Sequence, residues 1–133
     1  MPETSREYGE GREPMPAIGE PTVIFMINKS MRSSPWSDEH VYSATRRSWS
    51  IRNGDIRDRA VYALGVSHGV VRGAYRVERW HHDGGTRWSF DGQPAPDLGV
   101  VDTSVARLKG RKGDANPVRW FPDGVTAPSL DDK

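Results

Sequence analysis

The fold is decided by a stretch near the middle of the chain: Ala60-Val-Tyr-Ala-Leu-Gly-Val66, then Ser67-His68-Gly69, then Val70 to Trp80. Two runs rich in β-branched and aromatic residues flank a short polar turn that contains glycine. This pattern is typical of a β-hairpin, because glycine adopts the backbone conformation that a tight turn needs. We therefore predict two antiparallel strands joined at residues 67–69.

Three further stretches, on either side of the hairpin, predict additional strands. Residues 22–27 are apolar, rich in β-branched side chains and too few for a buried helix, so we expect a central strand there. Residues 86–90 form a run that ends at the turn signal Asp91-Gly92, and residues 117–121 form the last run.

Two helices are expected between these strands. Ser37 precedes the acidic residues Asp38 and Glu39, which is the arrangement of a helix N-cap followed by acids in the first turn. We predict the principal helix over residues 38–49 and a short second helix over residues 102–108. The order of strand, helix, three strands, short helix and strand predicts an α+β fold, a small mixed or largely antiparallel barrel.

Charge divides the chain into a basic centre and two acidic ends. Residues 1–20 carry five glutamates and two arginines, a net charge of −3, and residues 122–133 carry −2. The centre, residues 21–121, holds sixteen basic and ten acidic side chains and so carries +6, although the whole chain carries only +1. Because the ends are also rich in Gly, Pro, Glu and Ser, we predict disordered tails at residues 1–20 and 122–133 around one folded domain.

Fifteen of the nineteen basic residues are arginine. Arginine forms forked hydrogen bonds to phosphate and stacks on bases, so this bias favours a polyanionic partner. A GC-rich genome produces the same excess with no functional meaning, and the sequence leaves both explanations open. The acidic tails either increase solubility or fold back on the basic surface and compete with a nucleic acid.

Several classes of protein are excluded by composition. The chain has no cysteine, which excludes disulfides, thiolate zinc sites, iron–sulfur clusters and cysteine nucleophiles. The longest apolar run is far shorter than the ~20 residues of a membrane helix, and the first twenty residues carry acids where a signal peptide would be basic. We expect a cytoplasmic protein without membrane contact, and no cofactor.

The motifs that usually carry chemistry are weak. His81-His82-Asp83 is the best metal candidate, but neighbouring residues of a strand point to opposite faces, so we expect no metal site. The loop Gly110-Arg111-Lys112-Gly113 resembles a basic loop that contacts phosphates, although it lacks the spacing of a P-loop. A solvent-exposed turn without a function explains the same residues equally well. His68 is either an ordinary polar turn residue or a functional one.

Five tryptophans are many for a chain of this length. We expect Trp80, Trp88 and Trp120 to be structural, with the first two packed against each other across adjacent strands. Trp36 and Trp49 flank the principal helix, and the second of them lies near several arginines: Arg46, Arg47 and Arg52. Interleaved rings and guanidinium groups either stack an unpaired base and hold its phosphates, or simply pack a helix end with the arginines in solvent.

Taken together, several segments resemble a small bacterial domain found alone or beside GIY-YIG-type nuclease modules. They are Val23-Ile-Phe-Met-Ile-Asn28, Tyr42-Ser-Ala-Thr-Arg-Arg-Ser-Trp49, the hairpin over 62–80, Arg87-Trp-Ser-Phe-Asp-Gly92 and Asn116-Pro-Val-Arg-Trp120. The strand, helix and Gly-turned hairpin are also similar to the PUA-like superfamily, which includes the EVE, ASCH and YTH groups. The resemblance covers most of residues 21–121 and implies a pseudo-barrel that binds RNA or a modified base beside its first helix. The chain has no Gly-Ile-Tyr and Tyr-Ile-Gly pair, so only a binding role is implied.

The resemblance also implies which residues line the pocket. Asn28 or Ser67 would read the base edge, and Trp36 or Trp49 would stack on the base. Lys29 and Arg46 would hold its phosphate. The full set of expected nucleic-acid-binding residues is Asn28, Lys29, Ser30, Trp36, Thr45, Arg46, Trp49, Arg52, Ser67, His68, Arg111 and Lys112.

Three functions follow as hypotheses. The first is a non-catalytic module that binds RNA or DNA through an unpaired or modified base, with binding that weakens as salt rises. The second is a small nuclease or toxin-like enzyme in which His68 or His40 acts as general base near Arg46. The third is an interaction domain whose basic face meets an acidic protein partner, for example in a defence complex.

Overall fold

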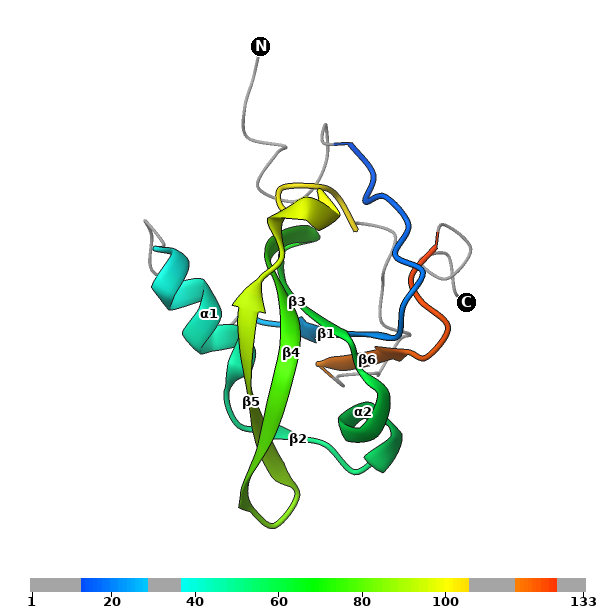
Figure 1. Cartoon of the computed structure of the whole chain (residues 1–133). Coiled ribbons are helices and arrows are strands. Elements are labelled where there is room, and N and C mark those ends of the chain that lie inside the picture. The colour runs from blue at the N-terminus through cyan, green and yellow to red at the C-terminus, as the bar shows by residue number, and fades with distance from the viewer. Residues whose placement is uncertain (1–12, 29–36, 106–116, 127–133) are drawn as a thin grey trace.

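The computed structural model describes residues 13–28, 37–105 and 117–126, and Figure 1 shows their arrangement. The elements are β1 (Thr22–Met26), α1 (Asp38–Arg46), β2 (Trp49–Ser50), α2 (Gly54–Arg59), β3 (Tyr62–Ser67), β4 (Val70–Gly84), β5 (Arg87–Pro94), the 3₁₀ helix η3 (Pro96–Leu98) and β6 (Val118–Phe121). No helix in these ranges is long and apolar enough to cross a membrane.

The predicted hairpin is confirmed as β3 and β4. Its two-residue turn consists of His68, with φ of 52°, and Gly69, with φ of 77°. Two positive φ angles in succession are what a type I′ turn requires, and this turn matches the twist of the flanking strands. The second strand continues past Trp80 to Gly84, so β4 and β5 form a second, longer hairpin that extends away from the rest of the sheet (Figure 1).

The six strands form one curled mixed sheet in the order β2-β5-β4-β3-β1-β6. β1 runs parallel to β3 and antiparallel to β6, while the other neighbours are antiparallel. β1 therefore has a neighbour on both sides, as expected for a central strand. The fold is a small α+β domain with a half-barrel sheet and two helices, and the expected fold class is confirmed at this level (Figure 1).

Apolar side chains form a core on each face of the sheet. Along β1, Val23 and Phe25 belong to the core that α1 and α2 cover, whereas Ile24 belongs to the opposite core. This alternation follows from the two-residue period of a strand. α1 approaches the sheet closely because Gly65 and Gly73 in the neighbouring strands have no side chain: a Cβ at Gly65 would overlap Thr45, and one at Gly73 would lie 2.8 Å from Val41.

The folded part extends beyond the expected boundaries at Pro21 and Phe121. Met15, Ile18 and Val125 are buried in the core that lies opposite the helices. Ile18 and Val125 exchange two backbone hydrogen bonds of 2.9 and 2.8 Å. These few apolar anchors bring residues 13–20 and 122–126 into the domain, although the composition of both segments resembles that of a tail.

The principal helix begins as predicted but ends earlier. Ser37 caps it by accepting the His40 N–H at 3.0 Å. The helix ends at Arg46, because Ser48 adopts a left-handed conformation and Trp49 enters β2. The Trp49 indole N–H donates to the Thr45 carbonyl at 2.8 Å and so satisfies one of the carbonyls that a helix end leaves unpaired.

The short second helix lies elsewhere than predicted. It is α2, which Asn53 caps by accepting the Asp55 N–H at 2.9 Å. Within the interval 102–108, residues 102–105 instead pair with β4 and its turn: Asp102 N–H donates to the Val71 carbonyl, and Val105 N–H to the Gly69 carbonyl, both at 2.8 Å. The other residues of that interval lie outside the described ranges.

β5 is also longer than the predicted strand. Its pairing with β4 continues through Asp91-Gly92 to Pro94, opposite Tyr75. The register places Phe90 opposite Trp80 and His82 opposite Trp88, so the two tryptophans expected to pack on each other are diagonal neighbours and not a direct cross-strand pair. Each tryptophan packs on the residue opposite it, with ring centroids 5.5 and 4.6 Å apart.

Candidate nucleic-acid interface

The expected binding residues fall in three places. Five of them lie outside the described residues: Lys29, Ser30, Trp36, Arg111 and Lys112. Asn28, Ser67 and His68 lie together at the turn that joins β3 to β4, and we call these three residues the turn cluster. Thr45 and Arg46 lie on α1, and Trp49 and Arg52 lie in and just after β2. The turn cluster and β2 are at opposite ends of β4, so the described residues do not form one pocket.

Hydrogen bonds connect the three residues of the turn cluster. The Asn28 Oδ1 accepts the backbone N–H of His68 at 2.9 Å, and the Ser67 hydroxyl is hydrogen-bonded to the His68 Nδ1 at 3.0 Å. Ser67 is fully buried, whereas Asn28 and His68 are exposed. The parallel pairing of β1 with β3 produces this contact, because it brings the carboxyl ends of both strands to the same edge.

Other parts of the chain reach the same end of the sheet. Val105 donates its N–H to the Gly69 carbonyl, and the Pro117 carbonyl accepts the Met26 N–H at 2.8 Å. Val105 is the last described residue before the interval 106–116, and Pro117 is the first one after it. The turn cluster therefore lies where several described segments converge: the end of β1, the turn after β3, and both residues that flank 106–116.

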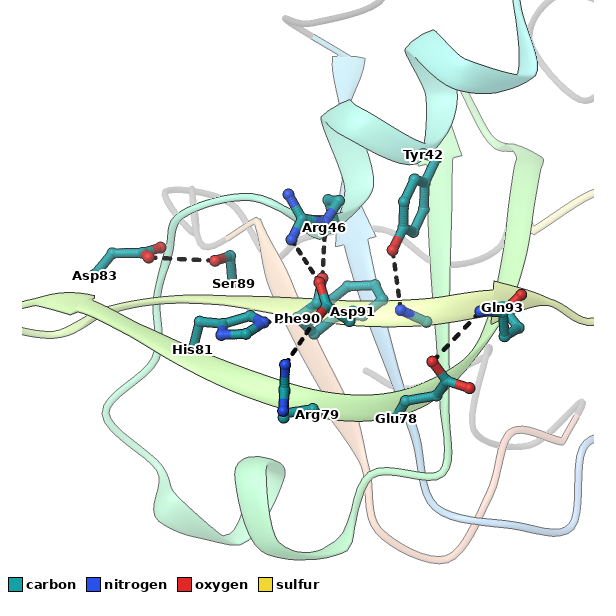
Figure 2. A network of polar contacts seen from close by, with 11 residues as sticks. Tyr42, Arg46, Glu78, Arg79, His81, Asp83, Ser89, Phe90, Asp91 and Gln93 are labelled. Carbon is teal, nitrogen blue, oxygen red and sulfur yellow. Dashed lines mark hydrogen bonds and ion pairs between the residues drawn. The ribbon is translucent and has the colours of Figure 1, made fainter.

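Arg46 and Tyr42 on α1 bind the backbone of β5. The Arg46 Nε donates to the Phe90 carbonyl at 2.9 Å, and the Gly92 N–H donates to the Tyr42 hydroxyl at 3.0 Å. Figure 2 shows both side chains reaching from α1 to the strand. The two-residue strand β2 does not reach the Phe90 carbonyl and the Gly92 N–H, so these two side chains satisfy them instead. In this way they protect the part of the β5 edge to which another strand could otherwise pair.

Asp91 is the centre of a polar network between α1 and the β4–β5 hairpin (Figure 2). Its Oδ1 accepts from the Arg46 Nη2 at 2.8 Å, and its Oδ2 accepts from the His81 Nε2 at 2.7 Å. The Arg79 guanidinium lies 3.9 Å from the same Oδ2. The hydrogen bond from His81, followed by that from Arg46, lowers the pKa of the Asp91 carboxyl below its usual value.

The Arg46 guanidinium belongs to this network and is half-buried. Burial acts to lower its pKa, but the hydrogen bond to Asp91 and the nearby Tyr42 hydroxyl outweigh burial, and the pKa is raised. The guanidinium carbon also lies 5.6 Å from the centroid of the Tyr42 ring. The sequence did not indicate Asp91 as the partner of Arg46 and His81, because Asp91-Gly92 has the signature of a strand end.

The Asp91 network predicts an acid-dependent loss of stability. Since its pKa is lower in the folded state than in the unfolded chain, ionised Asp91 stabilises the fold above the usual carboxyl pKa of about 4, and this contribution disappears as pH falls through the folded-state value. We expect Asp91→Asn to be less stable than the wild type at pH 7 and to lose less stability on acidification below about pH 4. Urea unfolding across the acidic range measures this difference.

Asp97→Asn is the matched control for the Asp91 experiment. Asp97 is exposed in η3 and forms no hydrogen bond or ion pair with the described residues. The free energy of unfolding of Asp97→Asn should therefore depend on pH in the same way as that of the wild type. If the free energies of unfolding of Asp91→Asn and the wild type changed equally with pH, Asp91 would not be an ionised partner of His81 and Arg46.

The remaining candidate residues differ in exposure. Thr45 is fully buried, and its hydroxyl donates to the Val41 carbonyl at 2.7 Å. Trp49 stacks on Phe25 with ring centroids 4.9 Å apart and an interplanar angle of 16°, so one face of its ring lies against the core. Arg52 is exposed.

The adjacent histidines bind different partners. The Nε2 of His81 contacts Asp91, whereas the Nε2 of His82 contacts the Gly85 carbonyl at 2.8 Å. Within residues 13–28, 37–105 and 117–126, no group of three or more His, Cys, Asp or Glu side chains is arranged to hold a metal ion.

The described residues define a class of structure, a small α+β domain built on a curled, six-stranded mixed sheet. No family model, curated protein or solved structure matches the chain. We therefore infer a function from the contacts described above, from the charge of the chain and from the residue types.

Proposed function

We propose that this protein is a non-catalytic nucleic-acid-binding module of PUA-like type, which recognises RNA or an unpaired or modified base. The turn cluster is the observation that carries this proposal. Asn28 and the adjacent pair Ser67-His68 come from two separate stretches of the sequence, and hydrogen bonds connect them at one end of the sheet.

The turn cluster has the chemistry that base recognition needs. Because the Oδ1 of Asn28 is bound to the His68 N–H, the amide is held in one orientation and its two Nδ2 hydrogens are presented as donors. An exposed amide of this kind matches the acceptors on a base edge. Unpaired bases present these edges, since they are free of both stacking and pairing.

Charge and architecture also support the proposal. Residues 21–121 carry a net charge of +6, mostly from arginine, which favours binding to phosphates. The curled sheet with α1 packed on one face is compatible with a pseudo-barrel of PUA-like type. Within the turn cluster, Asn28 lies between β1 and α1 in the chain, where the resemblance expects part of the base-binding pocket.

Fluorescence anisotropy of the full chain tests this function. Labelled single-stranded RNA, single-stranded DNA and duplexes are titrated at two salt concentrations. We expect binding that weakens with salt, and we expect Asn28→Ala to reduce affinity by up to about 10-fold, since a single hydrogen bond contributes about 0.5–1.5 kcal/mol. Gln93→Ala is the matched control, because it removes an exposed amide from β5, away from the turn cluster.

Each outcome of this titration bears on the proposal. Equal affinities for Asn28→Ala and Gln93→Ala would show that the turn cluster does not read the base. No binding of the wild type to any probe at low salt would reject the function as a whole. Cleavage or conversion of the labelled strand during the titration would favour the enzyme hypothesis over a binding module.

A further inference from the structure

Arginines and hydroxyls gather at the free edge of the sheet formed by β2 and the start of β5. The register places Ser50 opposite Arg87, and the Ser50 and Thr86 hydroxyls are 2.9 Å apart. The Arg87 Nη1 donates to the Ser48 carbonyl at 2.9 Å, which holds its side chain along β2. Arg47 precedes Ser48 in the chain. Figure 1 shows β2 beside the part of β5 nearest the hairpin tip.

Strand alternation places Ser50 and Arg87 on the face away from the core. Trp49 and Trp88 face each other across β2 and β5 and pack against the core that the helices cover. Their neighbours Ser50 and Arg87 must therefore lie on the other face of the pair. In the same way Ile51 is buried, and Arg52 after it is exposed. We call the exposed set Arg47, Ser50, Arg52, Thr86 and Arg87 the β2 strip.

The arginines of the β2 strip form no ion pair with the described residues, unlike Arg46, Arg59 and Arg79. Residues 46–54 and 84–89 contain no Asp or Glu, and the acids next to these ranges have other partners: Asp55 pairs with Arg59, and Asp83 accepts from the Ser89 hydroxyl at 3.3 Å. Arg46 and Arg79 share Asp91, and Arg59 pairs with Asp55 at 2.9 Å. Arg47, Arg52 and Arg87 form no such ion pair with the described residues. Among the described residues, these three arginines therefore have no carboxylate within ion-pair distance.

We propose that the β2 strip binds the sugar–phosphate backbone of the nucleic acid whose base the turn cluster reads. This inference rests on the proposed function and adds a second contact at the opposite end of β4. Guanidinium groups bind phosphate oxygens through forked hydrogen bonds, and serine and threonine hydroxyls donate to the same oxygens. The strip contributes affinity and position, while the turn cluster contributes recognition of the base.

Salt dependence of binding measures how many phosphates the strip contacts. The magnitude of the slope of log affinity against log salt increases by about 0.7 per phosphate contact for single strands and by about 0.9 for duplexes. We expect the triple variant Arg47→Gln, Arg52→Gln, Arg87→Gln to reduce the slope by about 2 for single strands and nearly 3 for a duplex. Anisotropy titrations of the full chain with single-stranded RNA, single-stranded DNA and duplex DNA, each over a salt series, give this slope.

A second triple variant controls for the loss of total charge. Arg59→Gln, Arg76→Gln, Arg79→Gln removes three exposed arginines whose partners are acids or, for Arg76, the Tyr62 ring at 5.2 Å. We expect this control to change the slope much less than the strip variant does. The double variant Arg47→Gln, Arg52→Gln leaves the Arg87 hydrogen bond intact, so a reduced slope in it does not depend on a folding defect. Replacing the same arginines by lysine should restore the slope, since the slope counts charges.

The outcomes separate this inference from the function on which it rests. Salt-dependent binding with an unchanged slope in the strip variant would overturn the backbone site and leave the proposed function standing. Equal effects of the two triple variants would overturn the site as well, because the effect would then belong to net charge. Absence of binding by the wild type would overturn both. Tighter binding to polyglutamate than to the oligonucleotides would assign the strip to an acidic protein instead.

Discussion

Replacing Phe25 by alanine is expected to lower the free energy of unfolding by about 3–5 kcal/mol, the usual cost of removing a large buried ring. Phe25 is fully buried in β1 and stacks on Trp49 at 4.9 Å and on Phe90 at 6.1 Å. It therefore connects β1 to β2 and β5, which lie at the other end of the strand order. A domain of this size is stable by about 5–15 kcal/mol, so the loss is a large fraction of the total.

Urea unfolding followed by tryptophan fluorescence and by far-UV circular dichroism measures this effect. Val101→Ala is a suitable control, because Val101 is 45% exposed and its truncation should cost within about 0.5 kcal/mol. Phe25→Leu should lie between the wild type and Phe25→Ala, since leucine fills part of the cavity. A loss below about 1 kcal/mol for Phe25→Ala would contradict the packing of β2 on β1 through these rings.

Replacing Gly65 by alanine is expected to destabilise the fold by about 1–3 kcal/mol, the usual cost of overpacking. A Cβ at this position would overlap the Thr45 hydroxyl and lie 3.2 Å from the Ile27 Cδ1. Thr45 is fully buried on α1, and its hydroxyl is bound to the Val41 carbonyl. The helix would therefore have to move away from β3 to accommodate the methyl group.

A double-mutant cycle isolates this contact. Thr45→Ala removes the hydroxyl, so Gly65→Ala should cost less in the Thr45→Ala background than in the wild type, with a coupling energy of about 0.5–3 kcal/mol. Gly19→Ala is the control for the glycine change, because nothing lies within 4 Å of a Cβ there. Additive effects of the two changes would mean that α1 does not lie against Gly65 as described.

The elements with compact local signals were predictable from the sequence. The hairpin of β3 and β4 has a Gly-containing turn between two strand-like runs, β1 is a short apolar run, and Ser37 marks the start of α1. In each case the deciding interactions involve residues a few positions apart. These signals depend little on the rest of the chain, which explains why the structure confirms them.

The candidate site was predictable only in part. Asn28, Ser67 and His68 do meet, because a parallel β1 and β3 bring their carboxyl ends to one edge. The hydrogen bonds of Arg46 to Phe90 and Asp91 were not foreseen, because its partners lie more than forty positions away and the Asp91-Gly92 pair resembles a turn. Its expected contact with a phosphate stays a prediction, and its guanidinium is already bound within the protein.

The sequence by itself determined the hairpin, the apolar strand β1, the capped start of α1 and the basic character of residues 21–121, because each depends on neighbouring residues or on composition alone. Only the tertiary structure decided where α1 ends, which terminal residues join the core and which arginines meet a carboxylate. Those outcomes depend on contacts between residues distant in the chain: the indole of Trp49 satisfies the Thr45 carbonyl, Ile18 pairs with Val125, and Asp91 binds Arg46 while no acid reaches Arg87 among the described residues. Burial and hydrogen bonding in three dimensions select these partners, and a local pattern carries no information about them.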